Sequence, residues 1–415
     1  MSNLNISLIH TSYPQHYTMI QTVLREFEAQ HNIQIELDSL VWENARYQLV
    51  EYALHKTGPV ISEVGSTWLS SLVSMNALLK LDSRSLERVT GSVALQGIDL
   101  AEMTDADIYL PTAWQSIVAL DNQIWAIPWT TDTRMIYYRR DLLQKAGVDE
   151  ATAFQSAAHW KNTLQQLQDA GGPFPILLNT VREPALLHKV ASWVWAEGGH
   201  FMQKGGRQTR FSEPEAQAGF YNYFNTFAPY LSPAAQNISE DLCSEMFSQG
   251  KGAMIVTGQW VLSRDLLGAM LPEVRENLGV AMMPVPPYVG GSHLVVWQHG
   301  LEQIREGLKL IEALTSHSAQ MRLVSHGRVL PSRKAILNDP LFTTEFGYEV
   351  ISQSLQAGAS FDASYMWGLI EDRLTMFVSD IWQRLFANPD LDLEGELNQR
   401  LGLLAQRLDK TLQSR

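Results

Sequence analysis

The sequence predicts an α/β protein of two lobes, each a sheet flanked by helices, with three chain crossings between the lobes. Strand-like and helix-like segments alternate over the first ~80 residues, which is typical of βαβ units and a parallel sheet. Three apolar extended segments, at 126–129, 279–287 and 328–336, each contain proline. No linker rich in Gly, Ser or Pro occurs, so a simple tandem of two domains is not indicated.

The composition is that of a soluble globular protein large enough for two or three domains. The chain has 415 residues, of which 45% are hydrophobic and 18% charged. A net charge of −13 argues against a duplex nucleic acid or an anionic membrane as the partner. No apolar run reaches the ~18 residues of a membrane-spanning helix. The single cysteine, Cys243, excludes an internal disulfide, and we expect it to be a buried, inert thiol.

The first part of the chain is predicted to repeat strand and helix. Each strand-like run is mainly apolar, and each following run places apolar residues at helical spacing. We expect strands at 5–10, 33–42 and 59–67 and helices at 18–31, 43–58 and 68–79.

The remaining chain is predicted to form the second lobe and to complete the first. Pro128 cannot donate a ladder hydrogen bond, so we expect the chain to leave one sheet there. Further strands are expected at 133–138, 253–258 and 294–298, with helices over most of 151–250, at 301–317 and from about 341 onwards. Lobe 1 is therefore expected to comprise 1–130 and 285–327, lobe 2 to comprise 131–284 and 328–415, and the hinge segments to lie near 128–133, 283–287 and 326–331.

Aromatic and charged residues gather just beyond the predicted carboxyl ends of the strands. In open parallel sheets, ligands bind at this edge. The chain has 12 tryptophans, and each needs a partner for its N–H when it is buried, so their positions are informative. A flat ring can stack on the C–H face of a sugar, while carboxylates and a guanidinium bind its hydroxyls. The candidates are Tyr13, Glu63, Trp68, Trp129, Asp132, Arg134 and Trp260.

For some of these side chains the residues alone leave two positions open. Trp68 either packs inward at the start of its helix or faces the cleft, with neither favoured. Trp260 follows a Gly–Gln turn, where a binding role is favoured over burial. We assign Asp132 to the cleft, and we leave Arg134 undecided between the cleft and a surface pair with Asp132.

Four segments carry a further pattern: IPWTTDTRMIYYRRDLLQKAG, MFSQGKGAMIVTGQW, WAEGGHF followed by FSEPEAQ, and GRVLPSRKAI. In these segments, and in their order and spacing over nearly the whole length, the chain resembles the family 1 extracellular solute-binding proteins of sugar ABC transporters, whose fold is that of maltose-binding protein. The first segment is similar to the family's crossover strand. The second is similar to its pattern F-x-x-G-x-x-A-M-x-x-x-G-x-W.

The resemblance implies a type II periplasmic-binding-protein-like fold and a protein that is not an enzyme. It implies that a mono- or oligosaccharide is captured in the cleft between the lobes, which close around it, and is delivered to an ABC transporter permease. We therefore expect a monomer, in the periplasm or at the cell surface, with no cofactor, metal or nucleic acid.

The resemblance also assigns roles to particular positions. Asp132 matches the acidic residue that contacts sugar hydroxyls, and Trp260 matches the ring that stacks from the second lobe. Of Trp193 and Trp195, we expect one in the core and one facing the cleft. The remaining expected positions are Tyr13 after the first strand, Glu63, Ser66, Thr67 and Trp68 after the third, Gly258 beside Trp260, and Tyr365 and Trp367 at the rim of the cleft.

Three alternatives stay open. An enzyme could act on glycosides through two of the carboxylates of Glu43, Glu63 and Asp132, although no catalytic motif or metal-ligand spacing is present. The same fold could bind a polyamine or another cation, which Arg134 in the cleft would disfavour. A cytoplasmic sensor is the third, because the start MSNLNISLIHTSYP lacks the features of a secretion leader; we expect that a leader was removed or that none is made.

Overall fold

The computed structural model describes residues 2–10, 14–90, 95–118, 122–231, 235–327 and 329–413. The chain folds into two compact units, and both are discontinuous in sequence. Unit 1 comprises Met1–Asp132, Gly290–Phe342 and Phe361–Gly368, and unit 2 comprises Thr133–Val289, Thr343–Ser360 and Leu369–Arg415.

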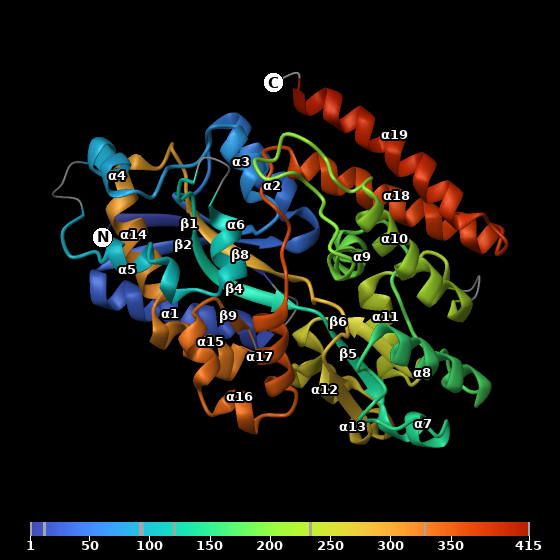
Figure 1. Ribbon diagram of the computed structural model, residues 1–415. Coiled ribbons are helices and arrows are strands. Elements are labelled where there is room, and N and C mark those ends of the chain that lie inside the picture. The colour runs from blue at the N-terminus through green and yellow to red at the C-terminus, as the bar shows by residue number, and fades with distance from the viewer. Residues whose placement is uncertain are drawn as a thin grey trace. The chain divides into compact units, whose positions relative to one another are not determined.

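A mixed sheet forms the centre of unit 1 (Figure 1). Strand β1 pairs in parallel with β2 and with β3, as the βαβ pattern predicts. Strand β8 is antiparallel to β3, and β9 is antiparallel to β4. Within the described residues the sheet has six strands in the order β2 (Ile33–Val41), β1 (Ser2–His10), β3 (Ile61–Gly65), β8 (Val289–Val296), β4 (Ile127–Thr133) and β9 (Leu330–Pro331).

Alternating side chains of β1 enter two hydrophobic clusters of unit 1. Leu4, Ile6 and Leu8 join the cluster that contains residues of α1 and α14, whereas Ile9 joins the cluster that contains residues of α2. Helix α1 also packs against α15 (Figure 1). The helices here are α1 (Pro14–His31), α2 (Trp42–His55), α3 (Leu69–Ser74), α4 (Ser83–Thr90), α5 (Leu100–Met103), α6 (Pro111–Ile117), α14 (Ile304–Thr315) and α15 (His317–Gly327), with the 3₁₀ helices η2 (Ala106–Ile108), η6 (Leu301–Gln303) and η7 (Lys334–Asn338).

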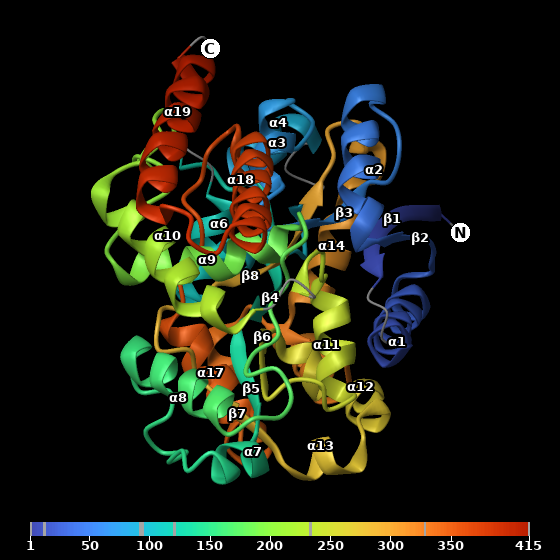
Figure 2. The ribbon, with the colours of Figure 1, turned by 90° about the vertical axis from the view of Figure 1, so that its right-hand side faces the viewer.

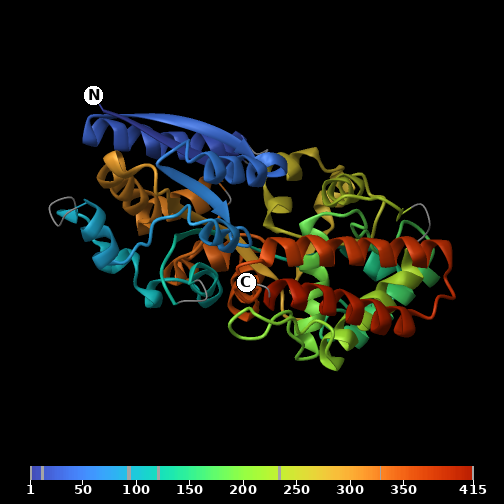
Figure 3. The same cartoon turned by 90° about the horizontal axis from the view of Figure 1, so that it is seen from above.

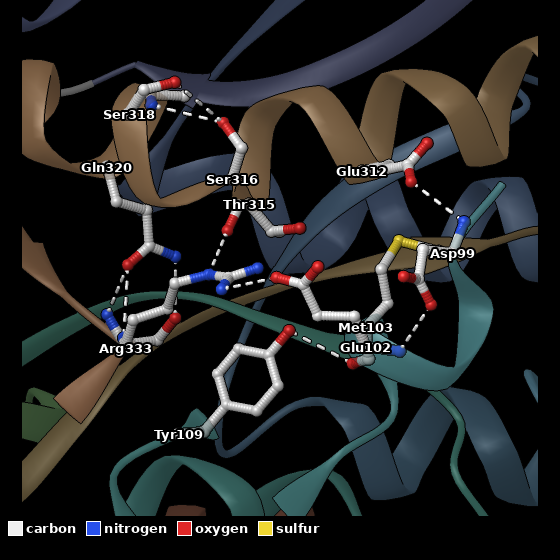
Figure 4. A network of polar contacts seen from close by, with 12 residues as sticks. Asp99, Glu102, Met103, Tyr109, Glu312, Thr315, Ser316, Ser318, Gln320 and Arg333 are labelled. Carbon is white, nitrogen blue, oxygen red and sulfur yellow. Dashed lines mark hydrogen bonds and ion pairs between the residues drawn. The ribbon is translucent and has the colours of Figure 1, made fainter. Parts of the chain in front are cut away.

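The segment around Arg333 is held inside unit 1 by a polar network (Figure 4). Arg333 Nε donates to the carbonyl oxygen of Thr315 at 2.6 Å, and Nη1 pairs with Glu102 at 2.8 Å. The Gln320 carboxamide oxygen accepts the N–H of Arg333 at 3.2 Å. Because this arginine side chain is buried, these contacts satisfy donors that water cannot reach, and they fix the chain after β9.

The divisions between the units differ in part from the predicted crossings. They lie at 132/133, 289/290, 342/343, 360/361 and 368/369. The first lies at the predicted crossing 128–133, and the second lies just after 283–287. The third does not lie at 326–331, because β9 and Arg333 are bonded within unit 1. The segment Phe361–Gly368 returns to unit 1, which adds two changes of unit to the three that were expected.

Unit 2 consists mainly of helices around a small antiparallel sheet (Figure 2). In its described part, this sheet has three strands, and the central β5 (Met135–Arg139) pairs with β6 (Met254–Thr257) and β7 (Leu278–Ala281). The strands lie where the sequence predicts them. Their pairing is antiparallel, and both partners of β5 come from a distant part of the chain.

Aromatic side chains fill the helical core of unit 2. Trp160 stacks on Trp193 at 6.0 Å between ring centroids and meets Phe227 edge-on at 5.0 Å. Helices α18 and α19 run alongside each other (Figure 3), joined by the Arg400–Asp380 ion pair. No described helix is both long enough and apolar enough to cross a membrane. The helices are α7 (Arg140–Lys145), α8 (Ala157–Asp169), α9 (Pro184–Ala196), α10 (Pro214–Phe227), α11 (Glu240–Ser248), α12 (Arg264–Ala269), α13 (Pro272–Glu276), α16 (Leu341–Thr344), α17 (Tyr348–Ala357), α18 (Trp367–Ala387) and α19 (Leu393–Gln413), with η3 (Ala228–Tyr230) and η5 (Gln259–Leu262); α16 and α18 each cross a unit boundary.

Candidate ligand-binding site

Arg134 is the centre of an aromatic cluster in unit 2. It stands between β4 and β5, and its side chain is only 3% exposed. The guanidinium carbon lies 5.0 Å from the ring centroid of Trp260 and 5.5 Å from that of Tyr288. A guanidinium over two ring faces is stabilised by cation–π attraction, which is stronger when water is excluded. We name this group, together with His188, Trp195 and Glu371, the Arg134 cluster.

Trp260 takes its position from the glycine that precedes it by two residues. It lies in η5, immediately after β6, and is partly exposed. A Cβ atom added at Gly258 would lie 2.0 Å from Cζ3 of the Trp260 ring. Only glycine lets the indole lie against the backbone at this point, so the predicted pair Gly258 and Trp260 acts as one structural element.

Tyr288 joins this cluster to helix α9. His188 and Trp195 are seven residues apart on α9, which places them on one face of the helix. The His188 ring stacks on Tyr288 at 3.8 Å with an interplanar angle of 9°. Trp195 is partly exposed and lies 6.4 Å from Tyr288 at an angle of 8°. The rings of His188 and Trp195 are thus both nearly parallel to that of Tyr288, which lies beside the arginine.

His188 is neutral, and its tautomer follows from its neighbours. Burial, and then the charges of Arg134 and Lys189, hold its pKa well below the ordinary value. Arg134 Nη2 lies 3.2 Å from His188 Nδ1, and a guanidinium can only donate. Nδ1 therefore accepts, and the ring proton is on Nε2, which lies 3.8 Å from a carboxylate oxygen of the buried Glu371.

A buried ion pair supports the cluster from behind. Lys189, the neighbour of His188, is 2% exposed, and its Nζ lies 3.3 Å from the Glu240 carboxylate. The Thr257 hydroxyl at the end of β6 donates to the same carboxylate at 3.0 Å. Burial raises the pKa of Glu240, but the charges of Lys189 and Arg134 outweigh burial and lower it. Glu240 therefore ties α9 to the strand that leads to Trp260.

The predicted loop after β3 is anchored within unit 1. Trp68 is 9% exposed, and a Cβ added at Gly65 would lie 3.1 Å from its indole. Its ring meets that of Trp42 at 5.3 Å, and Trp42 is 40% exposed. Ser66 and Thr67 are partly exposed, and the Ser66 N–H donates to the Gly291 carbonyl at 2.9 Å. This arrangement leaves Trp42, rather than Trp68, as the open aromatic face.

Asp132 and Glu63 differ sharply in exposure. Asp132 is partly exposed and accepts the Gly290 N–H at 3.1 Å. Glu63 is 3% exposed and accepts the Ile9 N–H at 2.7 Å. Burial raises the pKa of Glu63 to about 7, although hydrogen bonds from Ser292 and Ile9 oppose the shift. Glu63 therefore fixes the end of β1 and offers little carboxylate surface.

Two predicted rings lie in positions where they cannot stack on a ligand. Trp129 is 0% exposed in the core of unit 1. Successive residues of β4 point to opposite faces, so Trp129 faces inward while Thr130 and Asp132 are partly exposed. Trp367 is 2% exposed and packs against Phe361 at 4.4 Å. We therefore remove Trp129 and Trp367 from the candidate ligand contacts.

The remaining predicted positions are located as follows. Trp193 is buried, and Trp195 is partly exposed. Tyr365 is 37% exposed, and Tyr13 lies outside the described residues. No group of three or more His, Cys, Asp or Glu side chains in the described ranges could hold a metal ion.

The structure thus brings Arg134, Trp195, Gly258 and Trp260 together and adds three residues that the sequence reasoning missed. Tyr288 directly follows the proline-containing segment 279–287, so its place beside a crossing was available as a signal. His188 precedes Trp195 by two helical turns, which was also a readable signal. Glu371 carried none, because nothing local in α18 distinguishes it from an ordinary core-facing position.

A family model described as bacterial extracellular solute-binding protein matches residues 22–348 of the chain. The chain is also 20% identical over 396 residues to the diacetylchitobiose-binding protein DasA of Streptomyces coelicolor, an alignment that covers 91% of this chain and 85% of DasA.

Solved structures share the fold over nearly the full length. The sugar-binding protein MalE from Xanthomonas citri matches with a TM-score of 0.80 at 18% identity, covering 100% of this chain and 98% of that one. The GacH receptor of Streptomyces glaucescens, solved unliganded and with acarbose, matches with a TM-score of 0.77 at 18% identity, covering 98% and 99%. The fold is therefore the two-lobed, MalE-type α/β fold that the sequence predicts.

Proposed function

Because the chain belongs to the bacterial extracellular solute-binding protein family, we propose that it is a non-catalytic receptor that binds a carbohydrate and delivers it to the permease of an ABC transporter. The proposed ligand is a mono- or oligosaccharide, and the proposed location is the periplasm or the cell surface. One relative is named as a diacetylchitobiose-binding protein, and one solved structure with the same fold is named as a sugar-binding protein. These names support a carbohydrate as the ligand class.

The observation that carries the proposal is the Arg134 cluster. Trp195 and Trp260 are partly exposed, so each can offer an indole face to a ligand. The C–H face of a pyranose is slightly positive and is attracted by the negative face of an aromatic ring. Arg134 packs against Trp260 and Tyr288, which holds both rings in place before the ligand arrives. Such a preorganised aromatic surface is typical of sugar stacking.

The same cluster argues against the polyamine alternative. Arg134 carries a permanent positive charge and lies 5.0 Å from the Trp260 ring. A cationic ligand stacked on this ring would compete with the guanidinium for the ring face and would be repelled by it. In unit 1, Ser66, Thr67, Asp132 and the newly recognised Trp42 are the ligand contacts that we propose.

Isothermal titration calorimetry with diacetylchitobiose, maltose, maltotriose, acarbose and putrescine tests the proposal. We expect saturable binding of at least one carbohydrate, recovery of that sugar unchanged by chromatography, and no binding of putrescine. Trp260→Ala should weaken binding about fivefold, because one stacked ring contributes roughly 1 kcal/mol.

Phe346→Ala is the matched control, because Phe346 is a 47% exposed ring of unit 2 outside the cluster. It should leave the affinity unchanged. Absence of carbohydrate binding across a wider sugar panel, or hydrolysis of the bound sugar, would contradict the proposed function.

A further inference from the structure

Unit 2 contains a pocket that is separate from the Arg134 cluster. It has a volume of about 480 Å³ and is formed by the end of α10, the η3 turn, the end of α18 and the connection to α19. Figures 1 and 3 show α18 and α19 side by side at this connection. No residue of the Arg134 cluster lines the pocket. Its size is that of a small-molecule site.

Packed aromatic rings form the wall of this pocket. Trp382 is fully buried and meets Phe224 edge-on at 5.0 Å between ring centroids. Phe386 is partly exposed and stacks on Trp382 at 5.9 Å with an interplanar angle of 25°. Tyr221 adds a ring that is 36% exposed. Because the buried rings hold one another, the apolar wall is formed before any ligand binds.

Two carboxylates stand at the same pocket, both in exposed residues. They belong to Asp392 and Glu394, and Asp392 is held by the Gly395 N–H, which donates to its Oδ1 at 3.1 Å. Neither residue forms an ion pair with any described residue, and the described lining includes no Lys, Arg or His.

The arginines nearby are engaged elsewhere. Arg384 and Arg400 pair with Asp380 and Glu396, on the facing sides of α18 and α19. The pocket therefore combines aromatic rings with two carboxylates that no ion pair among the described residues neutralises. A ligand that fits this chemistry has an apolar body that packs on the rings and a positive charge that reaches the carboxylates and the ring faces.

We propose that this pocket binds a small organic cation with an apolar body, of the class of protonated aryl- or alkylamines. The site does not depend on the carbohydrate-binding function, because it shares no residue with the Arg134 cluster. Charge selects the ligand through Asp392 and Glu394. The accessible rings of Tyr221 and Phe386 supply the contact area, and the buried Trp382 supports Phe386 from behind.

The experiment compares 2-phenylethylammonium with its neutral analogue 2-phenylethanol on the full chain at pH 7, by isothermal titration calorimetry and ligand-observed NMR. We expect the cation to bind and the alcohol to bind about fivefold more weakly, since two exposed carboxylates together contribute roughly 1 kcal/mol. Raising the salt concentration should weaken the binding of the cation and leave the binding of the alcohol unchanged.

Three variants locate the site. The double variant Asp392→Asn/Glu394→Gln should weaken the binding of the cation about fivefold and leave the binding of the alcohol unchanged. Asn at position 392 keeps the capping geometry. Phe386→Ala should weaken both probes. Glu215→Gln/Glu245→Gln removes two exposed charges of unit 2 outside the pocket and should change neither affinity. Equal affinity for cation and alcohol, an unchanged affinity in the Asp392/Glu394 variant, or no binding of the cation would overturn the proposal.

Discussion

At the scale of single residues, the proposed site depends on the direction in which a few side chains point. In β4, Trp129 faces the core and Asp132 faces the other way, because successive strand residues alternate. Two residues later in the chain, Arg134 is buried against rings of unit 2. Three chemically prominent residues of one short segment therefore have three different roles: core packing, backbone anchoring at Gly290 and aromatic clustering.

Gly258→Ala is predicted to weaken carbohydrate binding about fivefold. The added Cβ would overlap the Trp260 ring, with the nearest atom at 2.0 Å, so the indole must leave its position and lose a stacking contact of roughly 1 kcal/mol. Calorimetric titration of the variant measures the loss. Gly268→Ala is the control, because no atom lies within 4 Å of a Cβ there, and it should bind like the unmodified protein.

Glu63 is predicted to make the stability of the protein fall as the pH rises. Its pKa is raised from 4.5 to about 7 in the folded protein, so between these values the folded state holds a proton that the unfolded state has released. Stability from this group is full below pH ~4.5 and is lost by pH ~7, a change of the order of 3 kcal/mol.

Urea unfolding of the unmodified protein and of Glu63→Gln, each at pH 5 and pH 8, measures this effect. The amide cannot ionise, so the variant should gain stability relative to the unmodified protein at pH 8. The exposed Glu87→Gln serves as the control and should give no pH-dependent difference. An identical pH dependence in all three proteins would contradict the assignment.

At the scale of elements, the buried pair of Lys189 and Glu240 aligns α9 with the end of β6. Glu240→Gln leaves the lysine charge buried without its counter-ion, which costs about 3 kcal/mol. We expect lower stability in denaturant and, because α9 carries His188 and Trp195, weaker carbohydrate binding as well. Glu240→Asp should restore part of both losses. Glu245→Gln on the exposed side of α11 should change neither.

Many of the helices and strands were predictable from the sequence, and the predictions that were wrong have physical causes. The βαβ start and the strands β5 and β6 follow from local pattern, because burial periodicity is a property of neighbouring residues. The prediction that the chain leaves the sheet at Pro128 was wrong, because Pro128 is the second residue of β4, which continues to Thr133. The antiparallel sheet of unit 2 was missed because pairing partners are set by distant segments. The third crossing was predicted at 326–331, but the chain there is held within unit 1. Arginine is usually exposed, so the residue type did not indicate that Arg333 is bonded in a buried network.

For the candidate site, the sequence identified residue types better than orientations. Trp260 and Arg134 were both candidates from their place after strand ends, with the position of Arg134 left open, and the two side chains lie together. Trp129 follows the same positional rule, and Trp367 was expected only from the family resemblance, yet both are buried, because the side of a strand or helix that faces the core depends on tertiary packing. The rings of Tyr288 and His188 lie 3.8 Å apart between centroids. The two residues are far apart in the sequence, so no local pattern could predict this contact.

At the scale of the whole molecule, a bound carbohydrate should stabilise the fold by mass action. At a ligand concentration of about 100 times Kd, the gain is roughly 2.7 kcal/mol, which raises the midpoint of thermal unfolding by a few degrees. Differential scanning fluorimetry across a ligand titration checks this. Trp260→Ala should show a smaller rise at the same ligand concentration, and a rise of equal size in the variant would place the ligand elsewhere.

The central claim is that a carbohydrate stacks on the open indoles of the Arg134 cluster. The most direct measurement is ¹⁹F NMR of protein labelled with 5-fluorotryptophan, with resonances assigned by single Trp→Phe variants and followed during titration with the sugar found by calorimetry. We predict that the Trp260 and Trp195 resonances shift with saturation, while those of the buried Trp129 and Trp160 stay in place. Saturable sugar binding with no change at Trp260 and Trp195 would contradict it.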